Sequence, residues 1–92
     1  MRKSVRTLLV GNERGVHGRV ATALAEIALR HQVRLVIVGA DGTERADCAS
    51  ILDVLALALV QGTAVRIEAE GMLADKALEA VEYLLTAKDD PQ

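Results

Sequence analysis

Within residues 63–70, apolar Val65, Ile67 and Ala69 alternate with charged Arg66, Glu68 and Glu70. A period of two predicts a strand with one face buried and the other face in water. Less regular stretches predict three further strands, over residues 4–10, 33–37 and 43–48. The turn-forming segment Gly39-Ala40-Asp41-Gly42 separates the last two of these, which indicates that they form a hairpin.

Apolar residues recur at spacings of three and four in two other stretches, which predicts amphipathic helices. The first covers residues 20–30, with an apolar face formed by Val20, Leu24, Ile27 and Ala28. The second covers residues 77–85, with an apolar face formed by Ala77, Leu78, Val81, Leu84 and Leu85. A shorter apolar helix is predicted before Gln61-Gly62. It begins at Ser50-Ile51-Leu52-Asp53, which has the form of a capping box, so the serine oxygen is expected to accept a hydrogen bond from the first turn.

The predicted order is strand, helix, strand, strand, short helix, strand, helix. An antiparallel sheet with helices on one face and water on the other is an α+β two-layer sandwich, and the charged alternates of residues 63–70 favour such an open face. A ferredoxin-like plait has nearly the same order, so periodicity alone leaves both folds open. We expect a single domain over residues 1–88 and a flexible tail over residues 89–92.

Composition narrows the range of partners. The 92 residues include one aromatic, Tyr83, and the net charge is −2. Nucleic-acid binding by base stacking needs aromatic side chains, and phosphate backbones and anionic lipids attract basic surfaces, so we expect no nucleic-acid partner. The longest apolar run, residues 54–60, is too short for membrane insertion, and no apolar stretch of a signal peptide follows residues 1–3. The lone Cys48 fits a reducing compartment, which predicts a cytoplasmic protein.

Gly15-Val16-His17-Gly18-Arg19 lies immediately before the first predicted helix and is the candidate functional segment. The start of a helix presents N–H groups without intrahelical partners and a partial positive charge, so it favours anions. A cation such as Arg19 in the first turn is unfavourable by about 0.3–1 kcal/mol, and an anion bound beside it reverses that cost. The alternative is that His17 only begins the helix and that Arg19 is a solvated side chain.

Three segments, in this order, resemble HPr, the histidine phosphocarrier family of the bacterial phosphotransferase system. Gly15-Val16-His17-Gly18-Arg19 is similar to the family's Gly-Leu-His-Ala-Arg-Pro signature. Ser50-Ile51-Leu52 is similar to its Ser-Ile-Met or Ser-Leu-Phe segment, and residues 61–65 and 69–71 resemble its last strand and the exit from it. The resemblance spans nearly the whole chain and implies a four-stranded antiparallel sheet with three helices on one face, in the order βαββαβα.

The resemblance implies a phosphoryl carrier rather than an enzyme with its own turnover. Enzyme I, charged from phosphoenolpyruvate, would phosphorylate His17 on Nδ1, and the carrier would pass the group to an enzyme IIA component or a regulatory target. The N–H groups of Gly18 and Arg19 and the Arg19 guanidinium would hold the phosphoryl oxygens, while the positive helix start favours a neutral imidazole. No metal and no cofactor are implied, and we expect a monomer.

Two residues depart from the family pattern. Val20 stands where proline is usual and Gly18 where a larger residue is usual, so we expect a less preorganised site, with the Val20 side chain half buried.

The resemblance also implies partner docking on four apolar residues, Val20, Ile51, Leu52 and Leu55. In some bacteria it implies regulatory phosphorylation of Ser50 by HPr kinase/phosphorylase, and transcriptional regulators are further candidate partners. The alternative function is a regulatory binding module that acts through the Ser50 surface without phosphotransfer.

Overall fold

A computed structural model describes residues 2–89 and 91, and over these residues the chain forms four strands and three helices in the order βαββαβα. The strands are β1 (Lys3–Leu9), β2 (Arg34–Val38), β3 (Arg45–Asp47) and β4 (Ala64–Glu70). The helices are α1 (Gly18–His31), α2 (Ile51–Ala56) and α3 (Ala74–Thr86).

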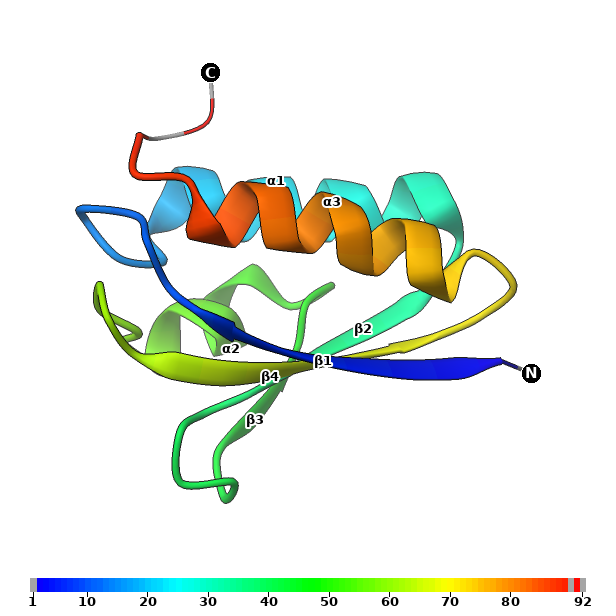
Figure 1. Ribbon diagram of the computed structural model, residues 1–92, viewed down its shortest axis with the longest axis horizontal. Helices are drawn as coiled ribbons and strands as arrows, with labels where there is room; N and C mark the ends of the chain where they lie inside the picture. Colours follow the sequence, from blue (N-terminus) through cyan, green and yellow to red (C-terminus); the bar gives the residue numbers. More distant parts are fainter. Residues whose placement is uncertain (1, 90, 92) are drawn as a thin grey trace.

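The strands form one antiparallel sheet in the order β1-β4-β2-β3 (Figure 1). The strand with the strictest alternation, β4, lies inside the sheet and pairs with both β1 and β2, while β3 is a short edge strand. Helix α3 packs over β1 and β4, α1 packs beside α3, and α2 contacts α1 and β3. The predicted α+β sandwich, with three helices on one side of the sheet, is confirmed.

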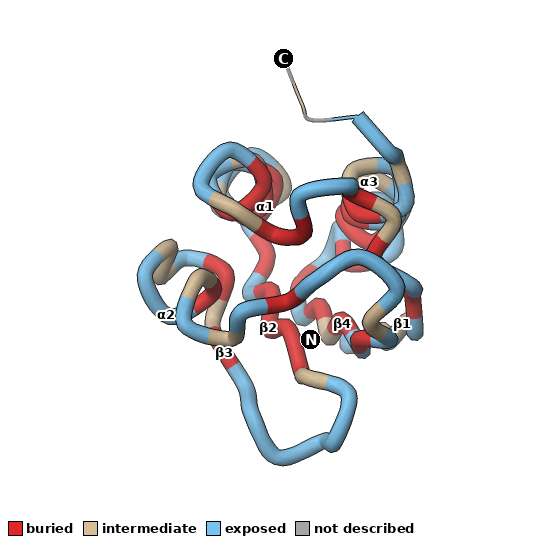
Figure 2. Tube along the Cα trace, turned by 90° about the vertical axis from the view of Figure 1, so that its left-hand side faces the viewer, coloured by how far each residue is buried: buried red, intermediate tan, exposed pale blue. Residues whose placement is uncertain are grey.

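Aliphatic side chains fill the space between the helices and the sheet, where the buried positions converge (Figure 2). The largest fully buried side chains include Leu24, Leu35, Ile37, Ile67, Leu78 and Leu85. They come from the inward positions of β2 and β4 and from the apolar faces of α1 and α3. The period of two in the strands and the spacing of three and four in the helices therefore identify the side chains that the two layers contribute to one shared core.

Several element boundaries differ from those predicted, among them the start of α3, which lies at Ala74 rather than Ala77. Helix α1 begins at Gly18 rather than Val20, and β3 covers residues 45–47 rather than 43–48. Helix α2 ends at Ala56, although the apolar run continues, because Ala58 adopts a left-handed conformation with φ +51° and turns the chain away from the helix axis. The predicted tail over residues 89–92 includes residues 90 and 92, which lie outside the described residues.

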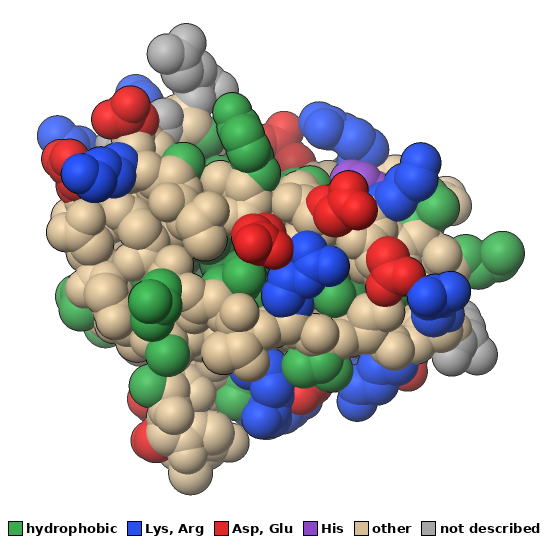
Figure 3. Space-filling model, in the orientation of Figure 1, with side chains coloured by type: hydrophobic (Ala, Val, Ile, Leu, Met, Phe, Trp, Pro, Cys, Tyr) green, Lys and Arg blue, Asp and Glu red, His purple; other side chains and the backbone are tan. Residues whose placement is uncertain are grey.

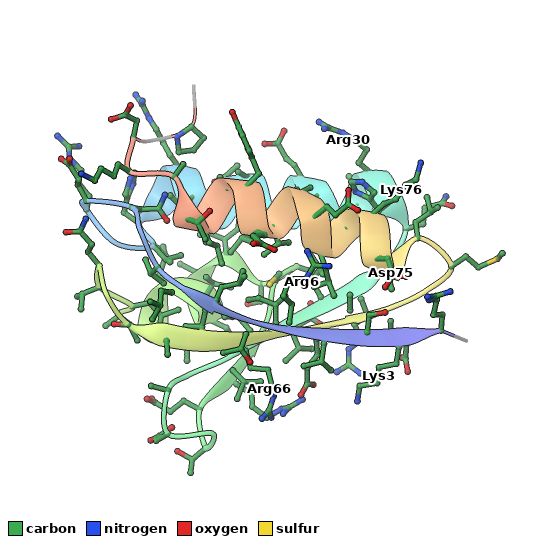
Figure 4. All side chains as sticks on the ribbon, in the orientation of Figure 1. Lys3, Arg6, Arg30, Arg66, Asp75 and Lys76 are labelled. Atoms are coloured by element: carbon green, nitrogen blue, oxygen red, sulfur yellow. The ribbon has the colours of Figure 1, made fainter. Side chains whose placement is uncertain are left out.

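The open face of the sheet is covered by its own charged side chains. Val36 and Val38 belong to this face but are buried, at 8% and 0% exposure. In the sheet register each lies between two polar residues of the neighbouring strands. The apolar stems of long charged side chains such as Arg66 can cover apolar surface while their heads stay in water, and Figure 4 places Arg66 and Lys3 on the side of the sheet away from α1 and α3.

An ion-pair network centred on Glu68 crosses this face. Arg45 donates to one Glu68 oxygen at 2.7 Å and Arg66 to the other at 3.3 Å, and the Glu68 side chain is only 12% exposed. The hydrogen bond from Arg45 is the main cause that holds the pKa of Glu68 below its ordinary value, and the charges of Arg45, Lys3 and Arg66 act in the same direction.

We expect this network to make stability depend on pH. Because the folded-state pKa of Glu68 is lowered, its contribution is complete above the unfolded-state value of about 4.3 and is lost as the pH falls below it. Glu68→Gln should lower the free energy of unfolding at pH 7 by about 0.5–1 kcal/mol and flatten its decline in acid. The free energy of unfolding in urea, measured between pH 3 and pH 7, tests this prediction, because that range includes the unfolded-state pKa of about 4.3. Glu70→Gln makes the same charge change on the same face, and an equal flattening there would contradict the assignment to Glu68.

Candidate functional site

The segment that leads to His17 is held tightly at one end of the molecule. After β1 the chain passes the end of α3, and these two segments lie side by side (Figure 1). Gly15 has φ +71°, and a Cβ added there would lie 2.3 Å from the Leu59 carbonyl oxygen. The Val16 N–H donates to that same carbonyl at 2.9 Å. Only glycine satisfies both the left-handed conformation and the close approach, so Gly15 brings the chain to His17 in one fixed direction.

His17 is the N-cap residue of α1. Its backbone is extended, at φ −96° and ψ −171°, and its carbonyl accepts from the Ala21 N–H at 2.9 Å. The ring is half-buried, and its Nδ1 accepts a long hydrogen bond of 3.4 Å from the Arg19 N–H. A nitrogen that accepts carries no proton, so the proton of the neutral ring lies on Nε2. Nδ1 therefore faces the N-terminus of α1, with its lone pair directed at the Arg19 N–H.

The charges around the start of α1 favour an anion. The first turn of α1 has no acidic residue, so none of its own carboxylates offsets the positive end of the helix. Gly18 and Arg19 are exposed, and space is open around the position where a Gly18 side chain would stand. Elsewhere positive and negative side chains are interspersed over the surface, as Figure 3 shows for one face. The start of α1 combines the backbone amides of two exposed residues and a cation with an imidazole nitrogen.

A groove of about 430 Å³ joins this site to α2. It is lined by Gly18, Arg19, Thr22, Ala23, Glu26, Ile51 and Pro91. Ile51 is half-buried beside the groove, Leu52 is 79% exposed, and Leu55 is half-buried against the core. The fold thus brings Ile51, one of the predicted docking residues of α2, next to the predicted phosphoryl site.

The prediction that Val20 contributes to the docking surface is wrong. Its side chain is fully buried, at 0% exposure, and belongs to the same core cluster as Leu24. The reason is that α1 begins at Gly18, so that Val20 lies at the third helical position, where the apolar stripe already faces the sheet. A partner cannot contact this side chain, and the predicted half-burial is wrong as well.

Ser50 stands at the N-cap of α2, as predicted, but its side chain makes no capping hydrogen bond. Its backbone carbonyl accepts from the Val54 N–H at 3.1 Å, and its own N–H donates to the Asp47 carbonyl at 2.9 Å. The neighbouring Asp47 carboxylate instead accepts from the Ala49 N–H at 2.9 Å. The predicted side-chain cap is therefore wrong, and the half-buried hydroxyl is not committed to holding the helix.

Other kinds of reactive site are poorly supported. Burial and the adjacent Asp47 carboxylate raise the pKa of the Cys48 thiol to about 12, so Cys48 is not a thiolate nucleophile near neutral pH. Over residues 2–89 and 91, no group of three or more His, Cys, Asp and Glu side chains could hold a metal ion. None of the helices in that part of the chain is long and apolar enough to cross a membrane.

Comparison with known proteins agrees with this geometry. Residues 5–87 match the family model described as the phosphorylation site of the HPr component of the phosphotransferase system. The chain belongs to the HPr family. The resemblance inferred from three short segments is thereby confirmed, and with it the assignment to the phosphocarrier proteins of that system. Membership implies that the partners are, in general terms, enzymes of the same system.

Individual members of the HPr family are similar over almost their full length. Phosphocarrier protein NPr of Shewanella violacea is 36% identical over 90 residues, which cover 98% of this chain and 97% of the relative. Phosphocarrier protein HPr of Haloferax volcanii is 33% identical over 87 residues, covering 95% and 98%. The crystal structure of HPr from Bacillus anthracis superposes with a TM-score of 0.80 at 26% identity, over 90% of this chain and 96% of that one.

Sequence reasoning missed two residues that shape the site. Asn12, in the loop after β1, is fully buried and bonded to the end of α3. Leu59 supplies the carbonyl that holds Val16. Asparagine is common in turns, so its presence in this loop does not indicate a buried role. The contact at Leu59 is made by a backbone carbonyl, which every residue has. Neither role could therefore be predicted from the sequence.

Proposed function

We propose that the protein carries a phosphoryl group on Nδ1 of His17 and passes it between larger proteins of the phosphotransferase system. The observation that carries the proposal is that Nδ1, as a hydrogen-bond acceptor, faces the N-terminus of a helix whose first turn holds a cation and no carboxylate. A deprotonated nitrogen is the nucleophile such a transfer requires, and a helix start is suited to the negative group that results.

The proposed step needs no further catalytic group on this chain. The Nδ1 lone pair attacks phosphorus, the N–P bond forms, and the bond from phosphorus to the donor's leaving atom breaks, while the ring keeps its proton on Nε2. The Arg19 N–H, which is weakly bonded to Nδ1 at 3.4 Å, is then available to a phosphoryl oxygen together with the Gly18 N–H. The exposed Arg19 guanidinium adds charge without enclosing the group, so the group can leave again.

The proposed donor is enzyme I charged from phosphoenolpyruvate, and the proposed acceptor is an enzyme IIA component or a regulatory target. Both would dock over the groove between α1 and α2, with Ile51 and the exposed Leu52 as the apolar contacts. Leu55 supports this surface from the core side. Incubation with enzyme I and phosphoenolpyruvate, followed by intact mass spectrometry, tests the proposal. The expected product carries one phosphoryl group that is lost in acid, and an unmodified chain would contradict it.

The uncommitted Ser50 hydroxyl supports a regulatory role for the same surface. We expect Ser50→Asp to weaken binding of enzyme I about tenfold, which corresponds to about 1.4 kcal/mol, because it adds a negative charge beside the apolar contacts. Stability should change by less than about 0.5 kcal/mol, since an aspartate is favourable at a helix start. Calorimetric titration and urea unfolding measure the two effects.

Ser50→Ala is the control. Because the serine side chain makes no capping bond, this variant should keep both stability and affinity close to those of the parent. Equal binding by Ser50→Asp and Ser50→Ala would show that enzyme I docks elsewhere. It would also remove the support for HPr kinase/phosphorylase acting on the docking surface through Ser50.

A further inference from the structure

Among residues 2–89 and 91, Asn12 is the one polar residue that the fold buries completely, at 0% exposure. Its Nδ2 donates two hydrogen bonds, to the Leu84 carbonyl at 3.0 Å and to the Ala87 carbonyl at 2.8 Å. Both acceptors lie at the C-terminal end of α3, where carbonyls lack intrahelical partners. A side chain from the loop after β1 therefore caps a helix that is distant in the sequence.

The residues on either side of Asn12 make the same connection through their backbones. The Gly11 N–H donates to the Leu85 carbonyl at 2.7 Å, and the Glu13 N–H donates to the Lys88 carbonyl at 3.0 Å. Three consecutive loop residues thus bond to the end of α3. A loop that is held at three successive positions cannot slide along the helix end without breaking several bonds together.

From Asn12 the connection continues to His17. The Gly15 N–H donates to the Asn12 carbonyl at 2.9 Å, and the His17 N–H donates to the Gly15 carbonyl at 3.1 Å. Between them, Val16 is held by the Leu59 carbonyl. A path of two backbone hydrogen bonds therefore joins Asn12 to the residue proposed to carry the phosphoryl group.

We propose that Asn12 is a positioning residue for phosphoryl transfer: by fixing the loop to the end of α3, it holds His17 Nδ1 against the start of α1. This inference rests on the proposed function of His17. The Oδ1 atom of Asn12 is buried and makes no hydrogen bond to a described protein atom. The Asn12 side chain therefore acts through the two bonds that its Nδ2 donates at the end of α3.

We expect Asn12→Ala to reduce the rate of His17 phosphorylation by about tenfold to a hundredfold at saturating donor protein, because small displacements of reacting groups have effects of that size. The concentration of donor at half-maximal rate should stay within about twofold, since the α1–α2 groove is untouched. Asn12→Asp keeps the shape but has no N–H donor, so it should not restore the rate. Asn12→Ser, which retains one shorter donor, should show a smaller loss and serves if Asn12→Ala does not fold.

The nitrogen-15 chemical shifts of the His17 ring provide a readout that does not depend on phosphorylation. At a pH where the ring is neutral, the parent should carry its proton on Nε2, and Asn12→Ala should show a mixture of the two tautomers, because the Arg19 N–H no longer holds Nδ1. Val81→Ala, a cavity variant in the middle of α3, is the control for general destabilisation.

Slower transfer and mixed tautomers in the Asn12 variants but not in Val81→Ala would support the positioning role. Equal tautomer populations and equal rates in Asn12→Ala and Val81→Ala would overturn it. If the parent itself takes no phosphoryl group, the proposed function fails, and the ring shifts alone still decide whether Asn12 positions His17.

Discussion

Val20→Ala is expected to lower the free energy of unfolding by about 2–3 kcal/mol. The side chain is fully buried in the core cluster, so the change removes two methyl groups' worth of burial, at about 0.8 kcal/mol each, and leaves a cavity in addition. Alanine is also the better helix former, which offsets a few tenths of a kcal/mol. Urea unfolding of both proteins at neutral pH measures the difference.

Val20→Pro distinguishes the effect of the backbone on stability from the effect of the side chain at the same position. The first helical N–H bond of α1 is the one from Ala21, so the Val20 N–H precedes it and proline forfeits no helix bond there. The ring also keeps carbon atoms in the buried site. We therefore expect Val20→Pro to lie between the parent and Val20→Ala in stability, rather than above the parent. A proline variant less stable than the alanine variant would mean that the ring does not fit the first turn.

The fold could be predicted because each layer has its own periodicity. The alternation over residues 63–70 identified the strand that pairs on both sides, and the helical spacings on α1 and α3 identified the faces that cover it. The end of α2 could not be predicted, because the apolar run continues through Leu57 and Leu59. The left-handed turn at Ala58 is imposed by the tertiary requirement that Leu59 be buried and its carbonyl meet Val16.

The centre of the site could be predicted, whereas the residues that support it could not. His17, Gly18 and Arg19 lie where a loop meets a helix, and the type of each residue already indicates anion chemistry. The exposure of Val20 could not be predicted, because an apolar residue near the start of a helix can face either a partner or the core. Which of the two it faces depends on the residue at which α1 begins, and α1 begins two residues earlier than predicted. The buried bonds of Asn12 depend on α3, far away in the sequence.

His17→Ala is expected to have the largest effect of any single substitution, namely complete loss of phosphorylation. The variant removes the acceptor nitrogen at the start of α1, and no other described side chain combines an unprotonated nitrogen with that helix end. His31, the other histidine, lies at the opposite end of α1, where its Nδ1 bonds with the Ile27 carbonyl at 2.8 Å. Stability of His17→Ala should fall by less than about 1 kcal/mol, because the side-chain cap that is lost is a single long hydrogen bond of 3.4 Å.

The most direct test is therefore a comparison of the parent, His17→Ala and His31→Ala after incubation with enzyme I and phosphoenolpyruvate. Intact mass spectrometry should find one acid-labile phosphoryl group on the parent and on His31→Ala, and none on His17→Ala. Circular dichroism should show that all three remain folded. A phosphoryl group that is still present on folded His17→Ala would contradict the account, because the start of α1 would then not be the place where this protein carries it.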